Sequence, residues 1–275
     1  MRNPLAAVVL ACMAFNAYAG QACTERTLRP EEVRAGLDLA LQVRDTLDQA
    51  KADVAIVARV GRDLSRYGLR YSHVGFVWRG HPRGEWTVVN ELNQCGTAES
   101  ALYDQGLGDF FLDDMFAYEA KIVIPSPAVQ RKIDTALAAR RGGRMHEPHY
   151  NLVAYAWGTR YQNSNQWVLE TTASALADEP VVTRAQAQAW LRGADLHPST
   201  IHLSAMERLG GELSRANIAF DDHPFDRRMA GEIDVVSAES VLDFLERIDA
   251  GATTRVLTAH AISGPGQPDR GTQKR

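Results

Sequence analysis

The chain has 275 residues, of which 45% are hydrophobic and 23% are charged, with 21 Gly and 11 Pro. This composition is ordinary for a soluble globular protein, and it excludes a collagen, a coiled coil, a disordered polyelectrolyte and a small disulfide-rich scaffold. The formal net charge of −4 argues against a general nucleic-acid binder, and no mid-chain apolar run approaches the roughly 20 residues of a membrane span.

The N-terminal segment has the three parts of a secretory signal peptide. Arg2 supplies a positive charge, residues 5–15 are almost all apolar, and Ala17-Tyr18-Ala19 has the small-x-small pattern that signal peptidase reads. We therefore expect residues 1–19 to be removed and the mature protein to be periplasmic or secreted. The alternatives are an uncleaved anchor, for which the apolar run is short, and a lipoprotein cut before Cys12, for which the preceding segment is short.

Two cysteines, Cys23 and Cys95, remain after removal of the signal peptide. Two cysteines in an exported protein usually pair, and closing a loop of this length could contribute roughly 4 kcal/mol of stability. The alternative is a catalytic thiol, but Cys23 lies in a terminal tail and Cys95 in an Asn-Gln-Cys-Gly turn. We expect a disulfide between them.

The first half of the mature chain reads as a helix followed by strands. Pro30, Glu31 and Glu32 suit the first turn of a helix that the apolar spacing extends to about residue 49. Residues 54–58 form a short apolar run typical of a buried strand. Residues 71–78 and 86–92 read as a β-hairpin.

Residues 96–116 hold several Gly, Asp and Phe, and they predict a long loop or short helices that could cover a site, with plain surface packing as the alternative. Further predicted elements are a strand over 118–124 and helices over 129–137, 150–158, 163–176 and 241–248. Capping-box patterns at 183–186 and 204–207 start two more helices. Residues 263–275 read as a disordered tail. One α+β domain over 20–262, a small antiparallel sheet flanked by helices, accounts for the rest.

His73 is the first candidate for chemistry. It shares one strand face with Tyr71 and Gly75, and a hairpin turn centred between residues 81 and 82 would place it opposite Asn90. A slip of one residue would exchange Asn90 for Glu91. Either residue could orient the imidazole as a general base. The alternative is a structural histidine bonded to the backbone.

Ser164 is the second candidate. The polar run Asn163-Ser164-Asn165 leads directly into the predicted helix over 163–176, so Ser164 should lie in its first turn. Free backbone N–H groups at such a position could stabilise an oxyanion, which suits a nucleophile. The alternative is an ordinary Ser or Asn helix cap.

Taken together, these motifs resemble known families. A His-x-Gly strand followed far downstream by Asn163-Ser164-Asn165-Gln166-Trp167 resembles the circularly permuted NlpC-type papain-like fold, whose lecithin:retinol acyltransferase-like branch carries Asn-Cys-Glu-His-Phe. More closely, the chain resembles the bacterial family DUF2145. The motifs for this resemblance are Ala-Arg-x-Gly around Arg59 and Gly61, Arg70-Tyr71-Ser72-His73, Leu92-Asn93-Gln94-Cys95-Gly96 and Tyr161-Gln162-Asn163-Ser164-Asn165.

The resemblance implies an exported hydrolase or acyltransferase acting on an amide or ester bond. Ser164 would be the nucleophile, His73 the base and Asn90 the orienting group, and Tyr71, Asn163 and Asn165 would bind substrate. His149 is added to the substrate-binding residues because it lies just upstream of the Ser164 helix. Peptidoglycan peptides or lipids are the substrates that it implies. Ser164 stands where the superfamily has cysteine, and a hydroxyl needs His73 to take its proton.

Two further readings stay open: a non-catalytic periplasmic binding protein that keeps the cleft, and a secreted domain that works through a partner surface. We expect no metal, because Pro148 prevents His146 and His149 from sharing a helix face and the acidic pairs lack calcium-loop spacing. We also expect no cofactor, because the chain has no phosphate-binding or dinucleotide-binding glycine motif.

Overall fold

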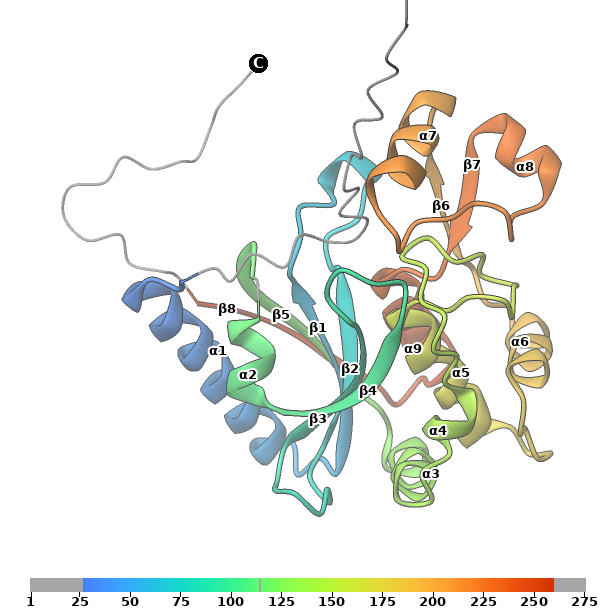
Figure 1. Cartoon of the computed structure of the whole chain (residues 1–275). Coiled ribbons are helices and arrows are strands. Elements are labelled where there is room, and N and C mark those ends of the chain that lie inside the picture. Colours follow the sequence, from blue (N-terminus) through green and yellow to red (C-terminus); the bar gives the residue numbers. More distant parts are fainter. Residues whose placement is uncertain (1–26, 114, 260–275) are drawn as a thin grey trace, which may run out of the picture.

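The computed structural model describes residues 27–113 and 115–259 (Figure 1). The main element of this part is an antiparallel sheet in the order β4-β3-β2-β1-β5-β8. Its strands are β1 (Val54–Val60), β2 (His73–Trp78), β3 (Thr87–Asn93), β4 (Ser100–Gly106), β5 (Ala117–Ile124) and β8 (Thr253–Thr258). A smaller sheet pairs β6 (Ser199–His202) with β7 (Glu232–Val235). The prediction of an α+β protein with an antiparallel sheet flanked by helices is confirmed.

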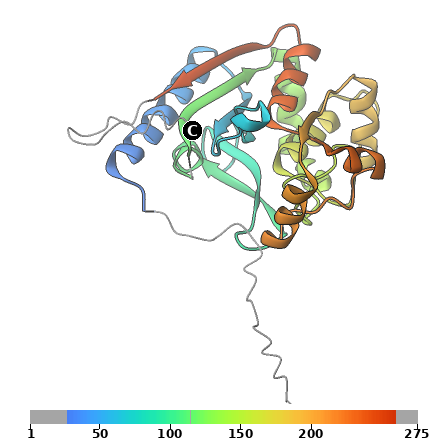
Figure 2. The same ribbon diagram turned by 90° about the horizontal axis from the view of Figure 1, so that it is seen from above.

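Helices cover both faces of the larger sheet. Helices α1 (Pro30–Gln49) and α2 (Leu107–Leu112) pack on one face, and α3 (Pro127–Ala138), α5 (Ser164–Leu176) and α9 (Ala238–Ile248) pack on the other (Figures 1 and 2). Every residue of β1 is buried as a result. This explains why residues 54–58 read as a continuous apolar run rather than an alternating one.

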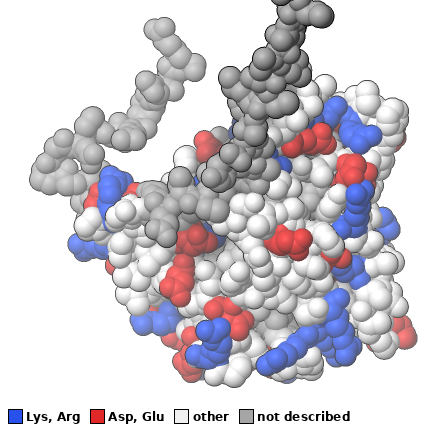
Figure 3. All heavy atoms as spheres, in the orientation of Figure 1, with Lys and Arg blue, Asp and Glu red and all other residues white. Residues whose placement is uncertain are grey.

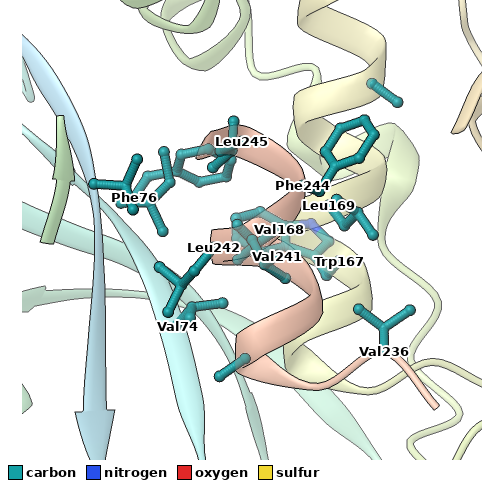
Figure 4. Close-up of a cluster of buried hydrophobic side chains, with 14 of the residues drawn as sticks. Val74, Phe76, Trp167, Val168, Leu169, Val236, Val241, Leu242, Phe244 and Leu245 are labelled. Atoms are coloured by element: carbon teal, nitrogen blue, oxygen red, sulfur yellow. The ribbon is translucent and has the colours of Figure 1, made fainter. Parts of the chain in front are cut away.

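The face toward α5 and α9 holds the larger hydrophobic core. Val74 and Phe76 of β2 project toward apolar side chains of α9 and α5, among them Leu242, Leu245 and Trp167 (Figure 4). Trp167 is almost fully buried, and its indole N–H donates to the carbonyl oxygen of Gly142 at 2.9 Å. This packing fixes α5 against the sheet, and with it the residue at its N-terminus.

The remaining elements lie on or beside α5 and the small sheet. They are the 3-10 turn Ser65–Tyr67, α4 (Gly142–Met145), α6 (Arg184–Gly193), α7 (Ala205–Ser214) and α8 (Phe225–Ala230). Thr183 and Ser204 form the capping boxes predicted for α6 and α7. A separate hydrophobic cluster joins the small sheet to the chain around Tyr67 and Leu69.

Two predicted segments differ from the structure. Residues 96–116 contain the short helix α2, which agrees with the predicted short helices, and strand β4, which was not predicted. The polar residues of β4 lie on an edge strand that has one neighbour and is only partly buried. Residues 150–158 form turns rather than a helix, and Asn151 and Tyr155 there bond to the distant residues Ala219 and Asp222. Tertiary hydrogen bonds replace the local helix. Strands β6, β7 and β8 and helices α4 and α8 were not predicted.

Several predictions concern residues outside the described part. The signal peptide, the C-terminal tail and Cys23 all fall there. Cys95 lies in an exposed turn after β3, and its pairing with Cys23 stays a prediction. Among the described residues, no helix combines the length and apolar character that crossing a bilayer requires.

Candidate active site

Ser164 is the first residue of α5, and the residue before it caps the helix. The side-chain oxygen of Asn163 accepts a hydrogen bond from the Gln166 N–H at 2.8 Å, while its amide donates to the carbonyl oxygen of Val236 at 3.2 Å. The sequence left open whether Asn163 or Ser164 caps the helix, and the structure shows that Asn163 does. The hydroxyl of Ser164 is left for another partner.

That partner is His73, the first residue of β2. The Ser164 Oγ lies 3.0 Å from His73 Nδ1, and the Oδ1 of Asn90 lies 3.0 Å from His73 Nε2. The amide nitrogen of Asn90 donates to Gln105 Oε1 at 3.1 Å, which turns the Asn90 oxygen toward the ring. An amide oxygen only accepts, so Nε2 carries the ring hydrogen and Nδ1 can accept the Ser164 proton. The three side chains are hydrogen-bonded in series, which is the arrangement that a nucleophile, its base and an orienting group require.

The predicted register of the hairpin is wrong by two residues. Strands β2 and β3 pair Phe76 with Val89 and Val77 with Val88, so the ladder extrapolates to place Gly75 opposite Asn90. The turn is centred one residue later than predicted. A shift of two residues keeps every side chain on its face, so His73 and Asn90 still meet, but diagonally.

Gly75 makes this diagonal contact possible. A β-carbon at Gly75 would lie 3.2 Å from the β-carbon of Asn90 and 2.7 Å from a methyl group of Val88. Any side chain here would displace one of them. The missing side chain at Gly75 lets Val88 and Asn90 pack close against β2. Glu91, the alternative third residue, lies on the opposite face of β3.

Helix α5 also takes over part of the hydrogen bonding of β2. The ladder between β2 and β3 covers only Phe76–Trp78 of β2. N-terminal to this ladder, the side-chain oxygen of Asn165 accepts a hydrogen bond from the Val74 N–H at 3.1 Å. The amide nitrogen of Asn165 donates to the Ser72 carbonyl oxygen at 3.5 Å. Asn165 thus acts as a substitute strand partner and ties the first turn of α5 to β2 beside His73.

Burial controls the charge of His73. It lowers the pKa of His73 to about 3, with a further contribution from the charge of Arg59, while the hydrogen bond to Asn90 acts in the opposite direction. Arg59 is the Cα partner of His73 on β1, and its guanidinium lies over the Phe110 ring and bonds to Asp113 at 2.7 Å. The imidazole is therefore neutral near pH 7, the state in which it can accept a proton.

Ser164 borders a cavity of about 350 Å³. Of the residues predicted to bind substrate, Tyr71, Asn163 and Asn165 also line it, although their polar atoms have protein partners; the Tyr71 hydroxyl donates to Glu119 at 3.0 Å. His149 does not line it. Its ring is exposed and pairs with Glu147 at 2.7 Å.

Three neighbours of the site were not predicted. Tyr150 is buried, lines the same cavity and has its pKa raised by burial and by the charge of Glu91, an effect that Ser164 opposes. Gln105 orients Asn90, and Arg59 lies beside His73. A signal existed for Arg59, which is the single charged residue in the buried run 54–60.

A larger hollow of about 690 Å³ lies elsewhere, between α3, α4 and the C-terminus of α5. Its basic side chains include Lys132 and Arg141, and Figure 3 shows basic residues along the corresponding lower edge of the molecule. Lys132 donates to the Leu176 carbonyl oxygen at 3.2 Å and Arg141 to that of Ser174 at 3.0 Å. These cations satisfy the C-terminal carbonyls of α5, which is a structural role.

Residues 27–113 and 115–259 contain no group of three or more His, Cys, Asp or Glu side chains placed to hold a metal ion. His146 bonds instead to Ser100, with 3.0 Å between Nε2 and Oγ.

Comparison with known proteins identifies one family. The family model described as "Uncharacterized protein conserved in bacteria (DUF2145)" matches residues 46–245, a stretch that includes His73, Asn90 and Ser164. Comparisons with the curated proteins and with the solved structures gave no match.

Proposed function

Because the chain belongs to the bacterial family DUF2145, whose description states no activity, its function has to be inferred from the site, and we propose that it is a hydrolase or acyltransferase that uses Ser164 as its nucleophile. The observation that carries this proposal is the series Ser164–His73–Asn90, with both hydrogen bonds at 3.0 Å. The scissile bond would be an amide or an ester.

The geometry supports an acyl-transfer step. Ser164 Oγ would attack the carbonyl carbon while His73 Nδ1 takes the hydroxyl proton, and Asn90 would hold the resulting imidazolium through Nε2–H. The tetrahedral oxyanion would form beside the first turn of α5, where the helix dipole favours negative charge. Collapse would expel the leaving group with the proton from His73 and leave an acyl ester on Ser164. Water or a second acceptor would then release the acyl group.

The resemblance to the permuted papain-like fold supports the same roles. The base precedes the nucleophile in the chain, the base lies on a strand of an antiparallel sheet, and the nucleophile begins a buried helix. In this proposal Ser164 occupies the seat of the cysteine in those enzymes. Export through residues 1–19, a periplasmic or secreted location, a disulfide between Cys23 and Cys95, and peptidoglycan peptides or lipids as substrates belong to the proposal as well.

One observation favours a second function, a binding protein that keeps the cleft without catalysis. A base works best with a pKa near the operating pH, whereas the pKa of His73 is held at about 3 and the nearby charge of Arg59 opposes an imidazolium. If a bound substrate did not raise the pKa of His73, the imidazole would be a poor base for Ser164. The two functions differ in whether Ser164 reacts.

Labelling with an alkyl fluorophosphonate decides between them. Attack by Ser164 Oγ would form a phosphonate ester and release fluoride, with the proton passing to His73. We expect stoichiometric labelling of Ser164 by mass spectrometry, no labelling of Ser164→Ala, and a rate about 100-fold lower in His73→Ala. Ser174→Ala, which removes a buried hydroxyl from the same helix, is the matched control and should label like the wild type.

A thiol variant provides a second measurement. In Ser164→Cys, the helix dipole and the imidazole should both favour the thiolate, so iodoacetamide should react fast at mildly acidic pH and His73→Ala should slow it. An introduced thiol that reacts like a free one, together with no fluorophosphonate labelling of the wild type, would reject catalysis in favour of binding.

A further inference from the structure

The cavity beside Ser164 has a predominantly apolar wall. It lies where the small sheet and α7 meet the chain around Tyr67. Residues of the separate hydrophobic cluster form much of this wall, namely Leu69, Ile201, Leu203, Ile218, Phe220 and Val235. The side chains of this cluster therefore leave a cavity between them, and this cavity extends to Ser164.

The charged residues of the wall neutralise each other. Among the described residues that line the cavity, Arg66 and Glu207 are the charged ones, and their side chains form an ion pair. The wall also has neutral polar residues close to Ser164. Asn163 and Asn165 flank it in the chain, Ser72 accepts a hydrogen bond from Asn165, and Tyr150 interacts with Ser164 itself. A ligand would thus find polar groups near the nucleophile, apolar surface beyond it, and no unpaired charge.

We infer that this cavity binds the apolar acyl chain of the substrate, so that the bond presented to Ser164 is that of an acyl ester or acyl amide rather than a charged peptide. A charged peptide would lose its hydration here without gaining a partner, which is costly. An alkyl chain would gain from every methylene group removed from water. The inference rests on the proposed nucleophile for the reaction, but binding of the chain does not require it.

Binding is measured with the Ser164→Ala variant, which cannot react. The probes are straight-chain carboxamides from butanamide to decanamide, titrated by calorimetry. Affinity should rise about fourfold for each added methylene until the cavity is full. A peptidoglycan stem peptide, the competing substrate class, should show no binding.

Two neighbouring glycines of α7 give a matched pair of variants. A β-carbon at Gly211 would lie 3.2 Å from Ile218 at the cavity wall, whereas one at Gly210 would have nothing within 4 Å. Gly211→Leu should therefore fill the cavity and weaken octanamide binding at least tenfold. Gly210→Leu makes the same chemical change on the same helix and should leave binding within twofold.

A third variant covers the event that Gly211→Leu fails to fold. Ile218→Ala enlarges the cavity, so the chain length at which affinity stops rising should increase. Affinity that is independent of chain length, equal binding by the two glycine variants, or binding of the stem peptide instead would overturn the inference. Chain binding without fluorophosphonate labelling would reject the proposed reaction and leave the acyl-chain site standing.

Discussion

Two of the buried polar residues of helix α5, Glu170 and Ser164, have different surroundings. The carboxylate of Glu170 accepts hydrogen bonds from Arg184 at 2.7 and 3.2 Å and from Gln162 and Gln188, each at 2.7 Å. Ser164 bonds to His73 on one side and borders a cavity on the other. Glu170 is enclosed by protein partners on all sides, which is what a structural role requires, whereas Ser164 keeps one side open to a ligand.

Removal of Arg184 should have the largest effect on stability. Arg184→Met leaves the buried carboxylate of Glu170 without its cation, and we expect the free energy of unfolding to fall by about 3–5 kcal/mol in urea titrations. Arg192→Met is the control on the same helix. Arg192 is exposed and stacks on Trp157 at 4.4 Å, so its loss should cost about 1 kcal/mol or less. Equal costs would show that Glu170 does not depend on Arg184.

Glu91 contrasts with Glu170 as a buried carboxyl group to which no arginine or amide side chain of the described chain donates a hydrogen bond. Neither of its oxygens has a hydrogen-bond partner among the described residues, and burial raises its pKa to about 8. The folded state then binds a proton that the unfolded state releases above about pH 4.5, so this group lowers stability as pH rises toward 8. Relative to Glu91→Gln, the wild type should lose about 3 kcal/mol of unfolding free energy between pH 5.5 and 7.5.

The same urea titrations at the two pH values check this expectation. A stability difference between the wild type and Glu91→Gln that stays constant with pH would mean that Glu91 titrates normally. The measurement would also show whether Glu91, whose charge affects the pKa of Tyr150, is ionised near pH 7.

The cap of α5 offers a smaller test. Asn163→Ala removes the acceptor for the Gln166 N–H, and we expect a loss of about 1 kcal/mol of unfolding free energy. Thr183→Ala removes the corresponding cap of α6 and should cost a similar amount. Fluorophosphonate labelling of Ser164 should fall about tenfold only in Asn163→Ala, because only that cap adjoins the proposed nucleophile. Equal labelling in both variants would show that the Asn163 cap does not affect the position of Ser164.

The smallest expected effect is that of pH on labelling. Because the pKa of His73 is about 3, the imidazole is neutral throughout the range from pH 5 to 8. The rate of fluorophosphonate labelling should therefore change less than about twofold over this range. A decline toward pH 5 with a midpoint near 6.5 would show that His73 is more solvated or less affected by Arg59 than the structure indicates.

The sequence predicted most of the elements around the site because their signals are local. Helix α1 begins and ends at the predicted residues, and the cap at Asn163 and the strand with His73 follow from patterns a few residues long. Even the wrong hairpin register brought His73 and Asn90 to one face, since an error of two residues preserves side-chain direction.

What the sequence could not supply depends on contacts between distant segments. Residues 150–158 lose their helical tendency to partners near residue 220, and His149 is turned outward to pair with Glu147. Glu170 was visible as a lone acid in an apolar helix, but its partners come from two other segments: Gln162 precedes the helix, and Arg184 and Gln188 lie on α6. The cavity has the same origin, because its wall combines segments from all three thirds of the domain.

The hydrogen bonds from α5 to β2 set an order on folding. Ser164 is 91 residues from His73, and Asn165 is 91 residues from Val74, whereas His73 and Asn90 are 17 apart. Local contacts form early and long loops close late, since closing a loop costs more entropy as it lengthens. The hairpin that orients His73 can therefore assemble before α5 docks. The Ser164 hydroxyl would reach His73 last. If Ser164 reacts as proposed, its labelling during refolding would report the completed tertiary structure and not its earlier stages.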